Sequence, residues 1–204
     1  MDLNLFFTKP PVLETERLFL RKLELEDAPA YFRFAHDPAV SAATLWEPHG
    51  TIEDTVKELR DVMHKFDSRQ AIRRGIFLQA TGDLIGRTGL IRVDPVHDNA
   101  HLGYAIASEH WNRGYVTEAA KEVLRFSFLE AGLHRMEARC NSNNAASYRV
   151  LDAIHSVILS REFLLRNGSD NPTAASISSP PPPLANGYRI GKNRLGHTCK
   201  IPDR

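Results

Sequence analysis

The stretch His110-Trp-Asn-Arg-Gly-Tyr-Val-Thr-Glu118 links a strand-like segment to a helix-like segment and decides how the rest of the chain is interpreted. Before it, Ala100–Ala107 alternates between apolar and polar side chains, which is typical of a strand. After it, Val116–Ala131 carries apolar side chains at helical spacing. A glycine beside a basic residue at the start of a helix can present backbone N–H groups to a phosphate or pyrophosphate. The alternative is that Gly114 is only a turn glycine ahead of a helix.

Further elements follow on both sides of this stretch. Apolar periodicity predicts a first strand at 17–23, a helix from Glu26, a late strand at 135–140 and a last helix at 145–154. A Thr51–Asp54 capping box marks the start of a second helix at Thr51. A Thr81-Gly-Asp83 turn predicts a hairpin at 76–85. Hairpins in the middle of the chain and strand–helix–strand at its end predict a mixed sheet covered by helices.

The composition of the 204 residues excludes several classes of protein. Lys and Arg number 26 and Asp and Glu number 25, so the net charge of +1 argues against a coat for nucleic acid or for an anionic membrane. Two cysteines cannot build a disulfide framework, and the nine histidines show no metal-ligand spacing, so we expect no metal. The sequence has no run of roughly 18 apolar residues and no basic N-terminal start. We therefore expect a cytoplasmic protein without a membrane span.

The last part of the chain differs from the rest. Six of the twelve prolines fall in residues 169–204, four of them consecutive at Pro180–Pro183 after the small, polar run Thr173–Ser179. This part carries a formal charge of +3, whereas residues 1–168 carry −2. Such a segment buries little apolar surface. We therefore predict a folded domain at 12–168 with a boundary near Gly168, and a Ser/Pro-rich, basic, disordered tail at 169–204.

Four motifs in the body resemble one enzyme family. His110–Ala119 resembles the acyl-CoA motif of the GNAT N-acetyltransferases, and Asn141–Leu151 resembles a later helix of the same family. Leu13–Arg21 and the segment Trp46–Asp54 resemble the RimJ/RimL branch, which acetylates N-terminal amines of ribosomal proteins. The resemblance covers about residues 12–168 and implies an α+β GNAT fold, in which a mixed, mostly antiparallel, twisted sheet is flanked by helices.

The resemblance implies acetyl-CoA as the co-substrate and places it at the strand, loop and helix start described above. In the family the pantetheine arm follows the strand, which often bulges and separates from the next strand, and the pyrophosphate lies on the loop and the helix start. The residues implied are Tyr104, Ala105 and Ile106 on the strand, Asn112, Arg113, Gly114, Tyr115, Val116 and Thr117 in the loop and helix, and Asn144 on the later helix.

The transfer needs a proton acceptor for the amine and a proton donor for the leaving thiolate. Many family members carry a Tyr where this chain has Leu151, so that donor is missing here. The RimJ/RimL-like branch carries a Ser at the position of Ser147, which the resemblance implies as the donor; the alternative is an ordinary serine of a first helical turn. Relatives often have Glu where His101 stands. A histidine there can accept a proton near neutral pH, and an exposed edge residue is the alternative.

The acceptor site is less defined than the acetyl-CoA site. Glu47 and His49 are candidate acceptor-binding groups, and Trp46 is a third that packs in the core on the alternative interpretation. We expect the acceptor to be an N-terminal amine of a protein, with a small-molecule amine as the second choice, no nucleic acid or membrane partner, and a homodimer as one assembly that the sequence allows.

The C-terminal part departs from the family pattern. The family continues after the last helix with a strand, a turn and a final strand, whereas here about three residues are missing before Ser160–Gly168 and the proline tract follows. We therefore expect the C-terminal strand to be altered or missing, with Asn186–Ile190 as the one later segment able to form a short strand. This departure motivates a rival function, a GNAT-fold module that binds acyl-CoA for regulation or interaction with little turnover.

Overall fold

The computed structural model describes residues 7–8, 10–44, 46–141 and 144–155, and the strand segments 163–166, 174–178, 188–192 and 198–202. Within these residues an eight-stranded sheet runs in the order β1-β2-β3-β4-β5-β6-β8-β7, and β9 pairs separately with β10. The strands are β1 Leu13–Glu14, β2 Leu18–Lys22, β3 Ile72–Leu78, β4 Leu84–Asp94, β5 Asn99–Ile106, β6 Arg135–Arg139, β7 Phe163–Arg166, β8 Ala174–Ser178, β9 Tyr188–Lys192 and β10 Thr198–Pro202.

Every neighbouring pair in the large sheet is antiparallel except β5 and β6, which are parallel. The predicted mixed, mostly antiparallel sheet is thereby confirmed. The parallel pair is joined by the helix that follows the His110–Glu118 stretch, because parallel strands need a long crossover connection.

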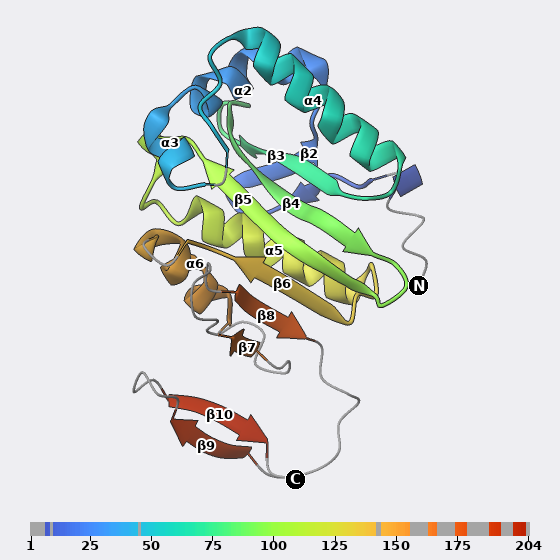
Figure 1. Ribbon diagram of the computed structural model, residues 1–204, viewed down its shortest axis with the longest axis vertical. Coiled ribbons are helices and arrows are strands. Elements are labelled where there is room, and N and C mark those ends of the chain that lie inside the picture. Colours follow the sequence, from blue (N-terminus) through green and yellow to red (C-terminus); the bar gives the residue numbers. More distant parts are fainter. Residues whose placement is uncertain are drawn as a thin grey trace.

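Helices cover the sheet on two sides (Figure 1). They are the short 3-10 helices η1 Leu25–Asp27 and η2 Ser108–His110, and the α-helices α2 Ala28–Ala35, α3 Pro38–Ala42, α4 Ile52–Asp67, α5 Tyr115–Leu129 and α6 Ala145–His155. One core joins the sheet to α5 and α6 and includes Leu18, Leu20, Val123 and Ile154. A second core joins the sheet to α2 and α4 and includes Tyr31, Phe34 and Leu59.

Helices α3 and α4 begin at side-chain caps. Thr51 Oγ1 accepts the Asp54 N–H, and the Asp54 carboxylate accepts the Thr51 N–H, so the predicted capping box is present at α4. Asp37 caps α3, because its side chain accepts the N–H of Ala39 and Pro38 occupies the first helical position.

The C-terminal part differs from the sequence expectation. The predicted boundary at Gly168 and the tract Pro180–Pro183 lie outside the described residues. Within the predicted tail, however, Ala174–Ser178 forms β8, which pairs with β6 on one edge and with β7 on the other. A strand therefore occupies the place where one was expected to be missing. The pairing uses backbone groups, which small residues supply as well as large ones, so composition alone did not reveal it.

Candidate active site

The candidate site lies where β5 and β6 stop pairing. The pairs run from Asn99 with Arg135 to Leu102 with Ala138, and β5 then continues to Ile106 without β6 beside it. A cleft of about 1300 Å³ opens here, and it is lined by residues of β5, the following loop, α4, α5, α6, β3 and β4. Backbone N–H and C=O groups on this unpaired edge of β5 are therefore available to a ligand.

A bulge in β4 lies across from this part of β5. The register of β4 against β5 shifts between Leu90 and Arg92, so Ile91 has no partner of its own, and it lines the cleft. Gly103 lies beside it, because a Cβ atom at Gly103 would come within 2.5 Å of Ile91 Cγ2. A bulge increases local twist and re-aims side chains. The family resemblance led us to expect the bulge on β5, but the register shift leaves the extra residue on β4.

The start of α5 presents free backbone N–H groups to the cleft. Gly114 is its N-cap with φ +78°, and no side chain caps the helix. Asn112 also has a positive φ, +59°, which turns the loop into the helix. The first amides of a helix lack partners within the helix, and the helix dipole adds partial positive charge there. Five of the six predicted loop residues line the cleft, namely Asn112, Gly114, Tyr115, Val116 and Thr117. Arg113 does not line it.

Arg17 braces this loop from the β1–β2 connection. Its Nε lies 2.7 Å from Glu118 Oε2, and its Nη1 donates to the carbonyl of Arg113 at 3.1 Å. Thr15 Oγ1 donates to the other Glu118 oxygen at 2.6 Å. These contacts hold the pKa of the Glu118 carboxyl below its usual value against the effect of its burial. The orientation of the α5 start thus depends on residues about one hundred positions earlier in the chain.

Ser147 meets Tyr104 inside the cleft. Ser147 Oγ lies 2.8 Å from Tyr104 Oη, and the Tyr104 hydroxyl also donates to the Ser147 carbonyl at 3.2 Å. Burial raises the pKa of Tyr104 well above its usual value, so the phenol stays protonated. Cys140, just after β6, also lines the cleft, and burial raises the pKa of its thiol while a hydrogen bond with Ser147 opposes that rise.

Asn144 fixes the first turn of α6. Its Oδ1 accepts the Ser147 N–H at 2.9 Å, and its Nδ2 donates to the Ala43 carbonyl at 2.9 Å. The side chain therefore caps α6 and ties it to the segment after α3, while Asn144 lines the cleft. A cap that holds Ser147 in place is a role that the sequence motif did not indicate.

His101 lines the cleft from β5 with a carboxylate nearby. Its Nε2 lies 3.8 Å from Glu137 Oε2, and 17% of its side chain is exposed. Burial lowers the pKa of His101 below its ordinary value near 6.5; Glu137 opposes the change, and the charges of Arg139 and Arg92 reinforce it. The imidazole is therefore neutral at pH 7 and able to accept a proton.

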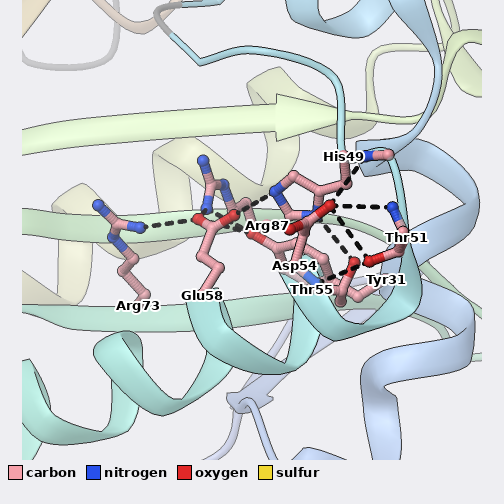
Figure 2. Close-up of polar contacts among 9 residues, drawn as sticks. Tyr31, His49, Thr51, Asp54, Thr55, Glu58, Arg73 and Arg87 are labelled. Atoms are coloured by element: carbon pink, nitrogen blue, oxygen red, sulfur yellow. Dashed lines mark hydrogen bonds and ion pairs between the residues drawn. The ribbon is translucent and has the colours of Figure 1, made fainter.

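A buried ionic cluster lies where α4 meets β3 and β4 (Figure 2). Glu58 is at its centre, and its Oε1 accepts from Arg87, from Arg73 Nη1 at 3.3 Å and from the Tyr31 hydroxyl at 3.2 Å. Glu58 Oε2 lies 3.0 Å from His49 Nε2. Burial raises the pKa of Glu58, but Arg87, Arg73 and His49 outweigh it and hold that pKa below its usual value. Glu58 is therefore ionised and a weak base.

The three residues predicted for the acceptor site lie in different places. Trp46 lines the cleft, with the Arg87 guanidinium 4.2 Å from its ring centroid. His49 is buried behind the cluster, where its Nδ1 lies 2.8 Å from Thr55 Oγ1, and it does not line the cleft. Glu47 is exposed and does not line the cleft either. Of the three, Trp46 alone faces the space where an acceptor would bind.

Glu58, Arg73, Arg87 and Cys140 line the cleft and were not singled out from the sequence. A weak signal existed, because Arg73 and Arg87 interrupt the apolar strands β3 and β4 at positions that lie between buried neighbours. Charged residues are seldom buried unless they are paired. The sequence gives no means of pairing them with Glu58, which is fifteen or more residues away.

No three His, Cys, Asp or Glu side chains in the described part of the chain gather so as to hold a metal ion. Among the same residues no helix is long and apolar enough to cross a membrane.

The comparisons with known proteins agree with the fold. A family model described as an acetyltransferase (GNAT) domain matches residues 17–156. The uncharacterized N-acetyltransferase p20 of Bacillus licheniformis is 31% identical over 159 residues, which cover 76% of this chain and 85% of p20. The spermidine N(1)-acetyltransferase of Vibrio cholerae serotype O1 is 27% identical over 120 residues, covering 59% of this chain and 67% of that protein.

Among solved structures, RimL, a ribosomal alpha-N-protein acetyltransferase in complex with coenzyme A, has a TM-score of 0.70 at 17% identity and covers 82% of this chain and 96% of its own. At that identity the likeness supports the fold alone. The family match, which spans more than half of the chain, and the relationship to p20 carry the assignment further. This chain is an N-acetyltransferase that belongs to the GNAT family, in its RimJ/RimL-type group.

Proposed function

We propose that the protein transfers the acetyl group of acetyl-CoA to the α-amino group at the N-terminus of another protein. GNAT enzymes use acetyl-CoA, and membership of the family implies an amine acceptor. The observation that carries the proposal is the Ser147 hydroxyl, held 2.8 Å from the Tyr104 hydroxyl at the point where β5 leaves β6. A proton donor is thereby positioned beside an unpaired strand edge.

The residues around the cleft fit acetyl-CoA. The uncapped start of α5 offers backbone N–H groups and a positive helix end to the pyrophosphate. The unpaired edge of β5 offers hydrogen-bonding groups to the amide-containing pantetheine arm. Acetyl-CoA supplies the acetyl group as a thioester, whose sulfur is the leaving group. We assign its binding to Tyr104, Ala105, Ile106, Asn112, Gly114, Tyr115, Val116, Thr117 and Asn144, all of which line the cleft.

Two side chains move the protons. When the amine nitrogen bonds to the acetyl carbon and the C–S bond breaks, the amine loses one proton and the sulfur gains one. His101, which is neutral at pH 7, accepts the proton from the amine. Ser147 gives its hydroxyl proton to the sulfur, while the protonated Tyr104 hydroxyl, 2.8 Å away, turns its hydrogen bond from the Ser147 carbonyl to the Ser147 oxygen. Water then returns a proton to Ser147 and takes the extra proton from His101, so both side chains start the next turnover unchanged.

An α-amine suits this site better than a primary amine of a long alkyl chain. At pH 7 about one in ten α-amino groups is neutral, given a pKa of about 8, against about one in 2,500 for an amine with a pKa near 10.4. A histidine base of lowered pKa takes a proton most readily from the weaker base. This argument favours protein N-termini over lysine side chains and polyamines.

The charges around the cleft support the same choice. Six basic residues line it, Lys57, Arg73, Arg87, Arg92, Arg139 and Arg149, against three acidic ones, Asp54, Glu58 and Asp61. A relative acts on spermidine, which carries several positive charges. A cleft with an excess of positive charge disfavours such an acceptor because like charges repel.

The first experiment measures release of free CoA thiol with two peptides, one with a free N-terminus and one with a blocked N-terminus and an internal lysine. We expect turnover on the first and little on the second. Ser147→Ala should lower kcat about a hundredfold while the Kd for acetyl-CoA changes less than about threefold. Tyr148→Phe, an exposed neighbour on the same helix, is the matched control and should leave kcat unchanged. Full activity in Ser147→Ala would remove Ser147 from the mechanism.

The second experiment follows the rate as a function of pH. Because only the neutral amine attacks and only neutral His101 accepts a proton, kcat/KM should fall as the pH drops through the amine pKa of about 8 and should show a second acid limb at the pKa of His101, which lies below 6.5. His101→Gln should lower kcat about a hundredfold and abolish this second acid limb. A second acid limb that persists in His101→Gln would assign the base to another group.

A further inference from the structure

Arg73 is a largely buried cation with few partners. Its side chain is 18% exposed and lines the cleft. Its contact with Glu58, through Nη1 at 3.3 Å, is long for a hydrogen bond to a charged group. Among the described residues its buried Nε has no hydrogen-bond partner. A buried donor without a partner costs free energy, which an additional acceptor would recover.

The charges of the cluster do not balance. Arg73 and Arg87 share one oxygen of Glu58, and the other oxygen of Glu58 faces His49. Burial lowers the pKa of Arg73, and the charge of Arg87 lowers it further, whereas Tyr31, Glu58 and Asp61 oppose both effects. Asp61 does not complete the pair, because its carboxylate lies 2.7 Å from Lys65 and is 48% exposed. Within the buried cluster, two arginines therefore share one carboxylate, and one positive charge is in excess.

The two arginines differ in how far they are committed to the fold. Arg87 contacts both Glu58 and the Tyr31 hydroxyl, and its guanidinium lies over the Trp46 ring. Among the described residues, Arg73 makes one long side-chain contact, and it faces the same cleft. Buried cations are normally paired, so the excess charge indicates that an anion from outside the chain completes this cluster. The planar guanidinium binds carboxylates with two parallel hydrogen bonds.

We propose that Arg73 is a specificity-determining residue that binds a carboxylate of the acceptor, so that the preferred acceptors are N-terminal segments with an acidic side chain close to the reactive amine. This inference rests on the proposed function, which assigns an N-terminal amine as the acceptor. It adds that the residue beside this amine carries a negative charge. Arg92, Arg139 and Arg149, exposed on the same cleft, contribute a field of the same sign.

The test compares peptides that are identical except for one residue next to the N-terminal serine, which is Asp, Asn or Lys. For the unmodified enzyme we expect kcat/KM for the Asp peptide to exceed that for the Asn peptide at least tenfold, mainly through KM. Arg73→Gln should remove this preference by lowering kcat/KM for the Asp peptide about tenfold and leaving the Asn peptide within twofold. Arg92→Gln, an exposed arginine of the same cleft, is the matched control and should keep most of the preference.

A structural role for Arg73 predicts a different pattern. If Arg73 only supported the fold, Arg73→Gln would lower kcat/KM for both peptides alike and lower the melting temperature. We expect the melting temperature to stay the same or rise, because the substitution removes an unbalanced buried charge. Equal loss on both peptides, or an unmodified enzyme that prefers the Asn or Lys peptide, would overturn the inference.

The failure of the proposed function is distinguishable from the failure of this inference. Free aspartate and its uncharged side-chain amide serve as small acceptors in the same assay. Acetylation of aspartate in preference to its amide, lost in Arg73→Gln and without activity on any peptide, would refute the protein acceptor and uphold the role of Arg73. Spermidine as the best acceptor, with turnover increased in Arg73→Gln, would refute both.

Discussion

The two ends of the cleft differ in the groups that line them, which are backbone groups at one end and charged side chains at the other. At one end the start of α5 and the free edge of β5 offer backbone groups, and no side chain caps the helix. At the other end α4, β3 and β4 contribute the charged side chains of Glu58, Arg73 and Arg87, which are held in a buried cluster. Backbone groups are present whatever the side chains are, whereas the cluster depends on the identity of each member.

This difference indicates how each end can change. The backbone end is the one proposed to bind acetyl-CoA, and a site made of backbone groups tolerates substitutions that keep the path of the chain. The charged end is the one proposed to face the acceptor, where a single exchange alters the balance of charge. We therefore expect substitutions at the charged end to affect stability and acceptor preference, and substitutions at the backbone end to affect affinity for acetyl-CoA.

The largest effect is expected at the charged end. Glu58→Gln removes the one carboxylate that Arg73 and Arg87 share, so two largely buried cations lose their counter-charge. Loss of one partner of a buried pair costs about 3–5 kcal/mol of unfolding free energy, which urea denaturation measures. Asp61→Asn, one turn away on α4, removes an exposed pair with Lys65 and should cost less than about 1 kcal/mol. Equal losses of unfolding free energy in the two variants would mean that the Glu58 cluster contributes no more to stability than an exposed ion pair.

The backbone end was predicted from the sequence and the charged end was not. The loop at Asn112–Thr117 is a local signal, because a glycine, a helix start and a preceding strand lie within about twenty residues. Glu58, Arg73 and Arg87 come from three elements and meet only after the sheet has formed. His49 was predicted as an acceptor-binding group, but it does not line the cleft and contacts Glu58 from behind it.

The fold followed the same rule. Helix α4 was predicted with its capping box because both partners are local, whereas α3, only five residues long, has too few apolar positions to give a periodic signal. The strand β8 was missed because its residues are mostly small, so their alternation gives only a weak hydrophobic signal, and its place beside β6 is set by a long-range backbone pairing.

The next effect is expected at the backbone end. Gly114→Asp places a side chain at φ +78° and a negative charge at the helix start, where the pyrophosphate is proposed to bind. We expect about a thirtyfold loss of affinity for acetyl-CoA, which corresponds to about 2 kcal/mol. Gly82→Asp is the matched control, because Gly82 also has a positive φ, +75°, and nothing within 4 Å of an added Cβ. Unchanged affinity in Gly114→Asp would mean that the pyrophosphate binds elsewhere.

The smallest effect tests whether the backbone end depends on side chains after all. Arg17 lies outside the cleft lining, yet it donates to the Arg113 carbonyl and pairs with Glu118 on α5. Since Arg17 is 44% exposed, its loss should cost about 1 kcal/mol or less, so we expect Arg17→Gln to weaken acetyl-CoA binding by up to about fivefold, measured by calorimetry.

Arg125→Gln is the control for this substitution, because Arg125 makes exposed ion pairs with Glu122 and Glu130 at the other end of the same helix. It should leave the affinity for acetyl-CoA unchanged. If Arg17→Gln also leaves it unchanged, the loop is held by its own backbone, and the contrast between the two ends of the cleft is complete. If Arg17→Gln weakens acetyl-CoA binding more than Gly114→Asp does, the contacts of the Arg17 side chain matter more to the loop than the conformation of Gly114. The loop then belongs to the side-chain-dependent part of the site.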